Sequence, residues 1–203
     1  MTLELFVRKL VRAAPTMAAI VSVTIATGCG AGCSASISTH SDKTGGTYNK
    51  HGVSFEIPDG WRQMRLTKQT QSGNEIWSES FGPKSGLDLV GVTAYATKVA
   101  ITQKNAAEHA PYAAASIKDI LTSAGGTLLE GPTLTAIGDM AGYRFETAFP
   151  EENGATLESR LLMVWNGHTE YFFNCQSRAH GSRSAEIERG CDTIIKSFRV
   201  NAG

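Results

Sequence analysis

Residues 52–61 read G-V-S-F-E-I-P-D-G-W, and this stretch sets the pattern for the folded part of the chain. Val53, Phe55 and Ile57 alternate with polar residues, which is the period-two pattern of a half-buried β-strand. The P-D-G sequence that follows favours a turn. The stretch therefore predicts a strand of a sheet that has one face on a core and ends at a tight turn.

Six further segments downstream have strand patterns, and short turns join several of them. Consecutive strands that are joined by short turns pair in the antiparallel sense. Asn166-Gly167 is a strong turn signal and is predicted to separate the last two strands. The predicted strands cover residues 75–81, 87–97, 127–134, 143–149, 156–165 and 170–176.

Two segments have the apolar periodicity of helices. The first covers residues 111–123, has a proline in its first turn and stops at Gly125-Gly126. The second begins near an N-cap at Ser182 or Ser184 and runs to Ser197. Helices with one apolar stripe each must cover the faces of a sheet. The predicted fold class is therefore α+β, an antiparallel β-sheet covered by two helices in an α/β/α sandwich.

Three consecutive aromatic residues, Tyr171, Phe172 and Phe173, lie in the last predicted strand. Because neighbouring residues of a strand point to opposite faces, the three rings cannot share one face. Either both faces of the sheet are covered there, or one ring is exposed and marks a binding patch.

The N-terminus has the pattern of a bacterial lipoprotein leader. A basic segment precedes the uncharged run at residues 16–26, which is too short to span a membrane, and A-T-G-C then ends at Cys29. We expect a lipoprotein signal peptide over residues 1–28 and lipidation of Cys29. The alternative is a secreted protein without lipid, and Cys33 is the weaker candidate acceptor.

The charge of the chain changes when the leader is removed. The 203 residues hold 19 basic and 19 acidic side chains. The leader contains three basic residues and one acidic residue, so 16 basic and 18 acidic side chains remain, a net charge of −2. Nucleic acid is excluded as a partner because phosphate binding needs a basic surplus. Contact with the membrane should run through the lipid on Cys29, and stable anchoring needs more than one acyl chain.

The rest of the chain divides into two parts. Residues 29–47 are rich in Gly, Ser, Thr and Ala and predict a flexible tether. Residues 48–203 have the length of a single α+β domain.

Two cysteines in the domain predict a disulfide bond. Cys175 lies in the last predicted strand, and Cys191 lies on the apolar face of the last helix. A helix that packs back over the preceding strand can bring two Cα atoms within bonding range, and export permits the oxidation. The alternative is a pair of separate buried thiols. Cys33 is left without a partner.

Motifs of catalysis and cofactor binding are missing from the sequence. It contains no G-x-S-x-G elbow and no phosphate-binding loop. The five histidines are scattered, none pairs with another at metal-ligand spacing, and we expect each to be a solvated loop residue. We therefore predict no catalytic residue, no metal site and no cofactor.

A family resemblance is carried by three segments at the two ends of the domain. They are G-V-S-F-E-I-P-D-G-W at residues 52–61, Y-F-F-N-C at 171–175 and I-I-K-S-F-R-V at 194–200. These resemble the Mog1/PsbP-like domains, and most closely the actinobacterial lipoproteins of the LpqN/LpqT type. The resemblance implies a binding or scaffold module and carries no catalytic motif. Fold alone does not fix function.

These observations predict a lipoprotein anchored outside the cytoplasm, whose domain binds a protein, a lipid or a cell-wall component without catalysis. Two alternatives remain open. One is an extracytoplasmic hydrolase or transferase without a recognisable motif, which would need a cleft with a pKa-shifted group. The other is a secreted interaction protein without lipid.

Overall fold

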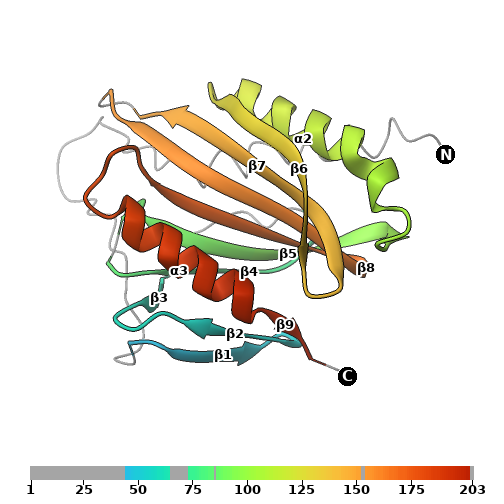
Figure 1. Cartoon of the computed structure of the whole chain (residues 1–203), viewed down its shortest axis with the longest axis horizontal. Helices are drawn as coiled ribbons and strands as arrows, with labels where there is room; N and C mark the ends of the chain where they lie inside the picture. Colours follow the sequence, from blue (N-terminus) through green and yellow to red (C-terminus); the bar gives the residue numbers. More distant parts are fainter. Residues whose placement is uncertain (1–43, 65–72, 85, 152–153, 202–203) are drawn as a thin grey trace.

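The computed structural model describes residues 44–64, 73–84, 86–151 and 154–201. These residues form two antiparallel sheets and two α-helices in an α+β arrangement (Figure 1). The predicted fold class is confirmed. The elements are β1 (Gly46–Lys50), β2 (Val53–Ile57), β3 (Arg62–Met64), β4 (Glu75–Gly82), β5 (Leu89–Ile101), η1 (Ala106–His109), α2 (Ala110–Ser123), β6 (Thr127–Ile137), β7 (Met140–Pro150), β8 (Thr156–Arg178), α3 (Ser184–Ser197) and β9 (Arg199–Val200).

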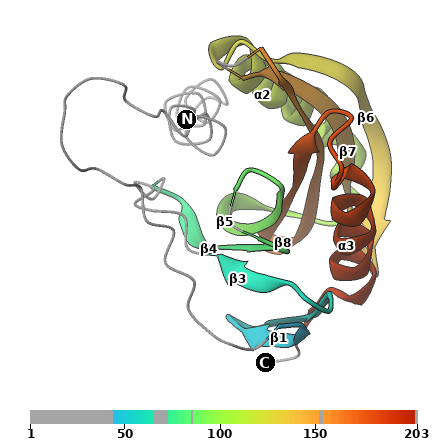
Figure 2. The same cartoon turned by 90° about the vertical axis from the view of Figure 1, so that its left-hand side faces the viewer.

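The larger sheet has the strand order β3-β4-β5-β8-β7-β6 and is antiparallel throughout. Its neighbouring strands follow one another along the chain except where β8 lies between β5 and β7. Figure 2 shows the sheet curving from β6 and β7 round to β3 and β4.

Strand β8 reverses direction within its own length. An extended strand of its 23 residues would be about 76 Å long at about 3.3 Å per residue. The backbone N–H of Ala179 nevertheless donates to the carbonyl oxygen of Thr156 at 2.8 Å. Gly167, with a φ of 60°, lies midway between them, so the turn predicted at Asn166-Gly167 is confirmed. The first half of β8 pairs with β7 and the second half pairs with β5.

Two separate cores cover the two faces of this sheet. Tyr171 and Phe173 belong to the core beneath α3, whereas Phe172 between them belongs to the core beneath α2. All three rings are buried, so both faces are covered at this point. The open question about an exposed aromatic ring is thereby settled by the strand's alternation. From α3, the side chains of Ile187, Cys191 and Ile194 enter the first core, and from α2 those of Ala113, Ile117 and Leu121 enter the second.

The smaller sheet, of order β1-β2-β9, closes the core beneath α3. Phe55 of β2 stacks on Tyr48 of β1 with ring centroids 4.6 Å apart and on Phe198 at 6.0 Å. Val53 pairs with Val200, so the last strand returns to the first hairpin. Figure 1 accordingly shows β9 beside β2.

Two predicted boundaries differ from the structure. Strand β1 begins at Gly46, so the last two residues of the predicted tether pair with β2. The N-cap of α3 is Arg183, not Ser182 or Ser184 as predicted, and it makes no side-chain capping bond. Ser184 is the first residue of the helix, and its hydroxyl donates to the carbonyl oxygens of Arg178 and Gly181 at 2.8 and 3.1 Å. The short strands β3 and β9 have no counterpart in the predicted elements.

Candidate functional site

The predicted disulfide is present. Cys175 of β8 and Cys191 of α3 are bonded, with Cα atoms 5.8 Å apart. Cys29, Cys33 and the predicted signal peptide lie outside the described residues. In the described part of the chain, none of the helices has the length and apolar character needed to cross a membrane.

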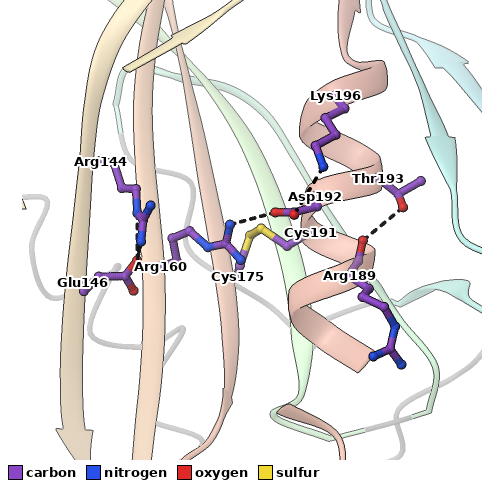
Figure 3. The surroundings of a disulfide bond; sticks show 9 residues. All are labelled: Arg144, Glu146, Arg160, Cys175, Arg189, Cys191, Asp192, Thr193 and Lys196. Carbon is purple, nitrogen blue, oxygen red and sulfur yellow. Dashed lines mark hydrogen bonds and ion pairs between the residues drawn. A yellow bond between two sulfur atoms is a disulfide. The ribbon is translucent and has the colours of Figure 1, made fainter. Parts of the chain in front are cut away.

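Charged side chains surround the disulfide on its solvent side (Figure 3). Arg160 of β8 donates from Nη1 to Asp192 Oδ1 of α3 at 2.8 Å, and Lys196 Nζ lies 3.5 Å from Asp192 Oδ2. Loss of solvation alone would raise the pKa of Asp192, but the hydrogen bond and charge of Arg160, together with Lys196, lower it below its usual value. On the neighbouring strand, Arg144 pairs with Glu146 at 2.6 Å. Within this group, the Arg160–Asp192 pair links α3 to the sheet, whereas Arg144 and Glu146 both lie on β7.

One predicted loop histidine has a defined environment. His51 lies in the turn between β1 and β2, with its ring stacked on Trp77 at 5.3 Å. Its Nε2 atom is 3.7 Å from Glu79, which also accepts from the hydroxyl of Tyr48 and the amide of Gln63. Among the described residues, no three His, Cys, Asp or Glu side chains are grouped so that they could hold a metal ion.

The opposite face of the sheet, toward α2, contains buried polar atoms without hydrogen-bond partners. Three buried side-chain polar atoms in the described residues have no hydrogen-bond partner: Arg62 Nε, Ser159 Oγ and Asn174 Oδ1. Buried polar atoms are nearly always paired in native proteins, and an unpaired one needs an explanation, such as local strain, a functional role, or a water or ion.

All three atoms come from the same face. Asn174 lies two residues after Phe172 of the α2-side core, so its side chain shares that face. Ser159 is two residues from Leu157 and two from Leu161, which both belong to the same core. Because every second residue of a strand points to the same face, Ser159 also lies on this face.

The sheet register extends this polar face toward β3. Asn174 pairs with Gly91, Gly91 with Ser80, and Ser80 with Met64, so these residues form one row across the sheet. Arg62 is two residues before Met64 and lies on the same face of the neighbouring row. Seven polar residues on this face lie in the row of Asn174 and in the rows on either side of it. We call them the polar strip: Arg62, Ser78, Ser80, Thr93, Ser159, Asn174 and Gln176.

Hydrogen bonds inside the polar strip satisfy part of its polar groups. The amide nitrogen of Asn174 donates to Gln176 Oε1 at 3.3 Å, and Gln176 Nε2 donates to the carbonyl oxygen of Leu87 at 2.9 Å. Ser78 and Thr93 share a hydrogen bond of 2.8 Å. These bonds orient the amide of Asn174, and its oxygen has no hydrogen-bond partner.

Burial changes along the polar strip. Ser80, Thr93, Ser159, Asn174 and Gln176 are buried, whereas Arg62 and Ser78 near the β3 edge are half-buried. A Cβ atom added at Gly91 would meet nothing closer than 3.9 Å, with Ser80 Oγ and Asn174 Cβ at that distance. A methyl group at this position would therefore be in ordinary van der Waals contact with both side chains.

A pKa-shifted carboxyl group lies on the same face, two rows from Asn174. Loss of solvation raises the pKa of Glu170 to about 7, although a hydrogen bond from Trp165 Nε1 at 3.0 Å opposes the shift. Tyr95 pairs with Glu170 across the strands, and burial, Glu75 and Glu170 together raise the pKa of its hydroxyl.

Sequence reasoning did not identify the polar strip. Asn174 and Gln176 occupy alternate positions of a strand whose other residues are mostly large and apolar, and that was the available signal. Whether such residues are paired depends on strands far away in the sequence.

Comparison with known proteins identifies the fold. No family model and no curated protein sequence matches the chain. The chain is similar to the solution structure of cyanobacterial PsbP from Synechocystis, with a TM-score of 0.54 and 16% identity over 84% of this chain and 98% of that one. The chain has a PsbP-like fold.

Two further solved structures are similar. A crystal structure from Bacteroides thetaiotaomicron matches with a TM-score of 0.51 and 15% identity over 79% of this chain, which spans 50% of that protein. LpqN of Mycobacterium tuberculosis, a protein involved in cell envelope biogenesis, matches with a TM-score of 0.47 and 12% identity over 78% of this chain and 90% of its own. At these identities the similarity concerns the fold alone.

Proposed function

We propose that this protein is a lipoprotein anchored outside the cytoplasm, whose single domain acts as a non-catalytic binding module at the cell envelope. The observation that carries the proposal is the bond between Cys175 and Cys191. Structural disulfides form and persist in oxidising compartments and are rare in the cytosol. The leader that precedes Cys29 supplies the route of export.

The anchor is the lipid on Cys29. Between Cys29 and the first strand at Gly46 lies a segment that would reach roughly 55 Å if fully extended at about 3.4 Å per residue. That reach is sufficient to hold the domain clear of the lipid headgroups.

The proposed binding role is supported by the chemistry of the polar strip. Apart from Arg62, its side chains are hydroxyl and amide groups, which donate and accept hydrogen bonds without changing their charge near neutral pH. Such groups position a ligand, whereas proton transfer needs a group that titrates near the working pH.

The anchor is tested by membrane fractionation of a Cys29→Ala variant, with Cys33→Ala as the matched control. We expect Cys29→Ala to leave the membrane fraction and Cys33→Ala to remain in it. The intact mass of the mature protein should show acylation at residue 29. A Cys29→Ala protein that stays in the membrane like the wild type would refute the anchor, and an unmodified mature mass would favour the secreted alternative.

Glu170 favours a second candidate function, an extracytoplasmic hydrolase or transferase. A carboxyl group with a pKa of about 7 is suited to general acid–base catalysis, and such shifts gather at functional sites. Glu170→Gln would abolish any hydrolytic activity that the wild type shows on envelope extracts. Under the binding proposal, neither protein hydrolyses these extracts.

A further inference from the structure

Among the described strands, β6 is the one long open edge. Figure 2 shows it at the outer end of the curved sheet, and within the described residues it pairs with β7 alone. The other edge strands of the two sheets are β1, β3 and β9, which have five, three and two residues, whereas β6 has eleven. A very short edge strand offers little to a further chain, so the length of β6 makes it the edge at which pairing is expected.

Strand β6 is also apolar. Leu128, Leu129 and Leu134 are three of the six exposed large hydrophobic side chains in the described part of the chain, and Leu134, at 69%, is the most exposed of them. Glu130 is the only charged residue of the strand. A single exposed leucine needs no explanation, but three on one unpaired and nearly uncharged edge indicate a surface that another chain covers.

The two halves of β6 differ in how well they can pair with a further strand. The register with β7 shifts twice between Leu128 and Thr133, and Pro132 has no N–H group to donate. Bulges, prolines and charges are the usual means by which an edge avoids pairing. From Thr133 to Ile137 the register is unbroken, and the sequence T-L-T-A-I contains neither a charge nor a proline. This second half, which includes Leu134, is open to pairing.

The hairpin between β6 and β7 determines which backbone groups point outward from this segment. Ile137 pairs with Met140 across a two-residue turn that begins at Gly138, with a φ of 57°, so these two residues form a hydrogen-bonded pair. Such pairs alternate along a hairpin with pairs that exchange no hydrogen bonds. The N–H and C=O groups of Leu134 and Ala136 therefore point away from β7.

We infer that two copies of this protein pair through residues 133–137 of β6, as antiparallel neighbours in one continuous sheet. With a two-fold axis at Thr135, Leu134 lies opposite the partner's Ala136, and each such pair exchanges both N–H···O bonds. The large side chain of Leu134 then lies beside a small one, and the two Thr135 side chains form a favourable cross-strand pair on the other face. This inference goes beyond the proposed binding module and does not depend on the lipid anchor.

The segment is self-complementary, which favours a second copy as the occupant. Its outward donors and acceptors are paired by the identical segment, and no like charges are brought opposite each other. An axis at Leu134 would instead place Ala136 opposite the partner's Pro132, which cannot donate. Pairing uses up both edges, so assembly stops at the dimer. An interface of this length falls at the low end of the size range, below about 1,200 Å², so we expect a dimer that dissociates on dilution.

A cysteine at the two-fold axis tests the pairing. Opposite residues of a non-hydrogen-bonded pair have Cα atoms about 4.5 Å apart, within the roughly 4.4–6.8 Å span of a disulfide. The full chain with Thr135→Cys, and with Cys33→Ala to remove a second thiol, should form a covalent dimer when intact cells are oxidised with copper–phenanthroline.

Thr127→Cys in the same background is the matched control. Thr127 is exposed on the same strand, eight positions from the axis, so the two copies of this residue would be about 50 Å apart at about 3.3 Å per residue. We expect at least tenfold more cross-linked dimer from Thr135→Cys than from Thr127→Cys.

Variants of the edge test its contacts. Leu134→Lys places a charge in the interface and Ala136→Pro removes an outward N–H, so each should abolish the dimer that sedimentation detects in the mature protein purified in detergent. Val99→Lys, at another exposed apolar position, should leave the dimer unchanged. Because Leu134 is exposed in the monomer, the melting temperature of Leu134→Lys should equal that of the wild type at high dilution, which separates lost pairing from lost folding.

Several results would overturn the inference. They are equal cross-linking through Thr135→Cys and Thr127→Cys, a dimer that persists in Leu134→Lys, and an assembly that grows beyond two copies. A protein that is monomeric at every concentration and gives no cross-link at residue 135 would do the same. None of these results bears on the anchor, which is tested separately by the Cys29→Ala variant.

Discussion

Cys175 and Cys191 join the second half of β8 to α3, with Cα atoms 5.8 Å apart and a sequence separation of 16. Both side chains are buried in the core beneath α3. The bond therefore fixes the helix on the face of the sheet that it covers.

Replacement of both cysteines by alanine should lower the free energy of unfolding by about 3 kcal/mol. The reason is that the disulfide closes a loop of this size and thereby restricts the unfolded chain, and the variant loses that restriction. Urea denaturation of the two proteins measures the difference. Reductant should lower the wild-type midpoint and leave that of the double variant unchanged. A wild-type midpoint that is insensitive to complete reduction would contradict the prediction.

The architecture was predictable because its signals are local. Alternating apolar residues identify the long strands, helical periodicity identifies α2 and α3, and Asn166-Gly167 marks the reversal in β8. The disulfide was also predictable from the sequence, because Cys175 and Cys191 lie on two consecutive elements that pack together. The short strands β3 and β9 were missed because two or three residues give no periodicity.

The polar strip could not be predicted from local sequence patterns. Arg62, Ser159 and Asn174 come together through the pairing of strands that are distant in the sequence. The absence of a hydrogen-bond partner is a property of the assembled sheet, so no local pattern reports it.

A glycine in α3 is required by the packing of an aromatic ring. A Cβ atom at Gly190 would overlap the six-membered ring of Trp61 at Cη2 and Cζ2. Gly190→Ala should therefore destabilise the protein by about 1–3 kcal/mol, although alanine favours a helix interior by about 1 kcal/mol. Thermal and urea unfolding measure the change.

Combining Gly190→Ala with Trp61→Leu isolates the cause. The smaller side chain makes room for the methyl group, so the double variant should be less destabilised than the sum of the two single variants. Additive effects would show that the cost of Gly190→Ala does not arise at Trp61.

The ion pair between Arg160 and Asp192 should contribute little to the free energy of unfolding at neutral pH. Arg160→Met keeps an apolar side chain and removes the charge. The substitution should lower the free energy of unfolding by less than about 1 kcal/mol, because the Asp192 side chain is 44% exposed to solvent. The folded-state pKa of Asp192 lies below its usual value of 3.8, so this contribution is present above pH 4 and is lost as the pH falls through the lowered pKa. Urea midpoints of the two proteins should differ at pH 7 and converge near pH 2.

Glu170 has the opposite effect on stability. Its pKa is raised from 4.5 to about 7 in the folded protein, chiefly because the carboxyl group is removed from water. Between these two pH values the folded state binds one proton more than the unfolded state, so stability falls as the pH rises through this range. The shift corresponds to a penalty of about 3 kcal/mol that is fully present above pH 7.

Glu170→Gln should remove this penalty. The amide stays neutral at every pH, and its oxygen can still accept the hydrogen bond from Trp165 Nε1. The variant should match the wild type near pH 4 and exceed its free energy of unfolding at pH 8, as measured by urea denaturation across that range. Glu158→Gln, at an exposed position of the same strand, is the control and should follow the wild-type profile. If the Glu170→Gln and wild-type curves run parallel from pH 4 to 8, Glu170 is ionised with an ordinary pKa in the folded protein, and the case for it as a catalytic acid or base fails as well.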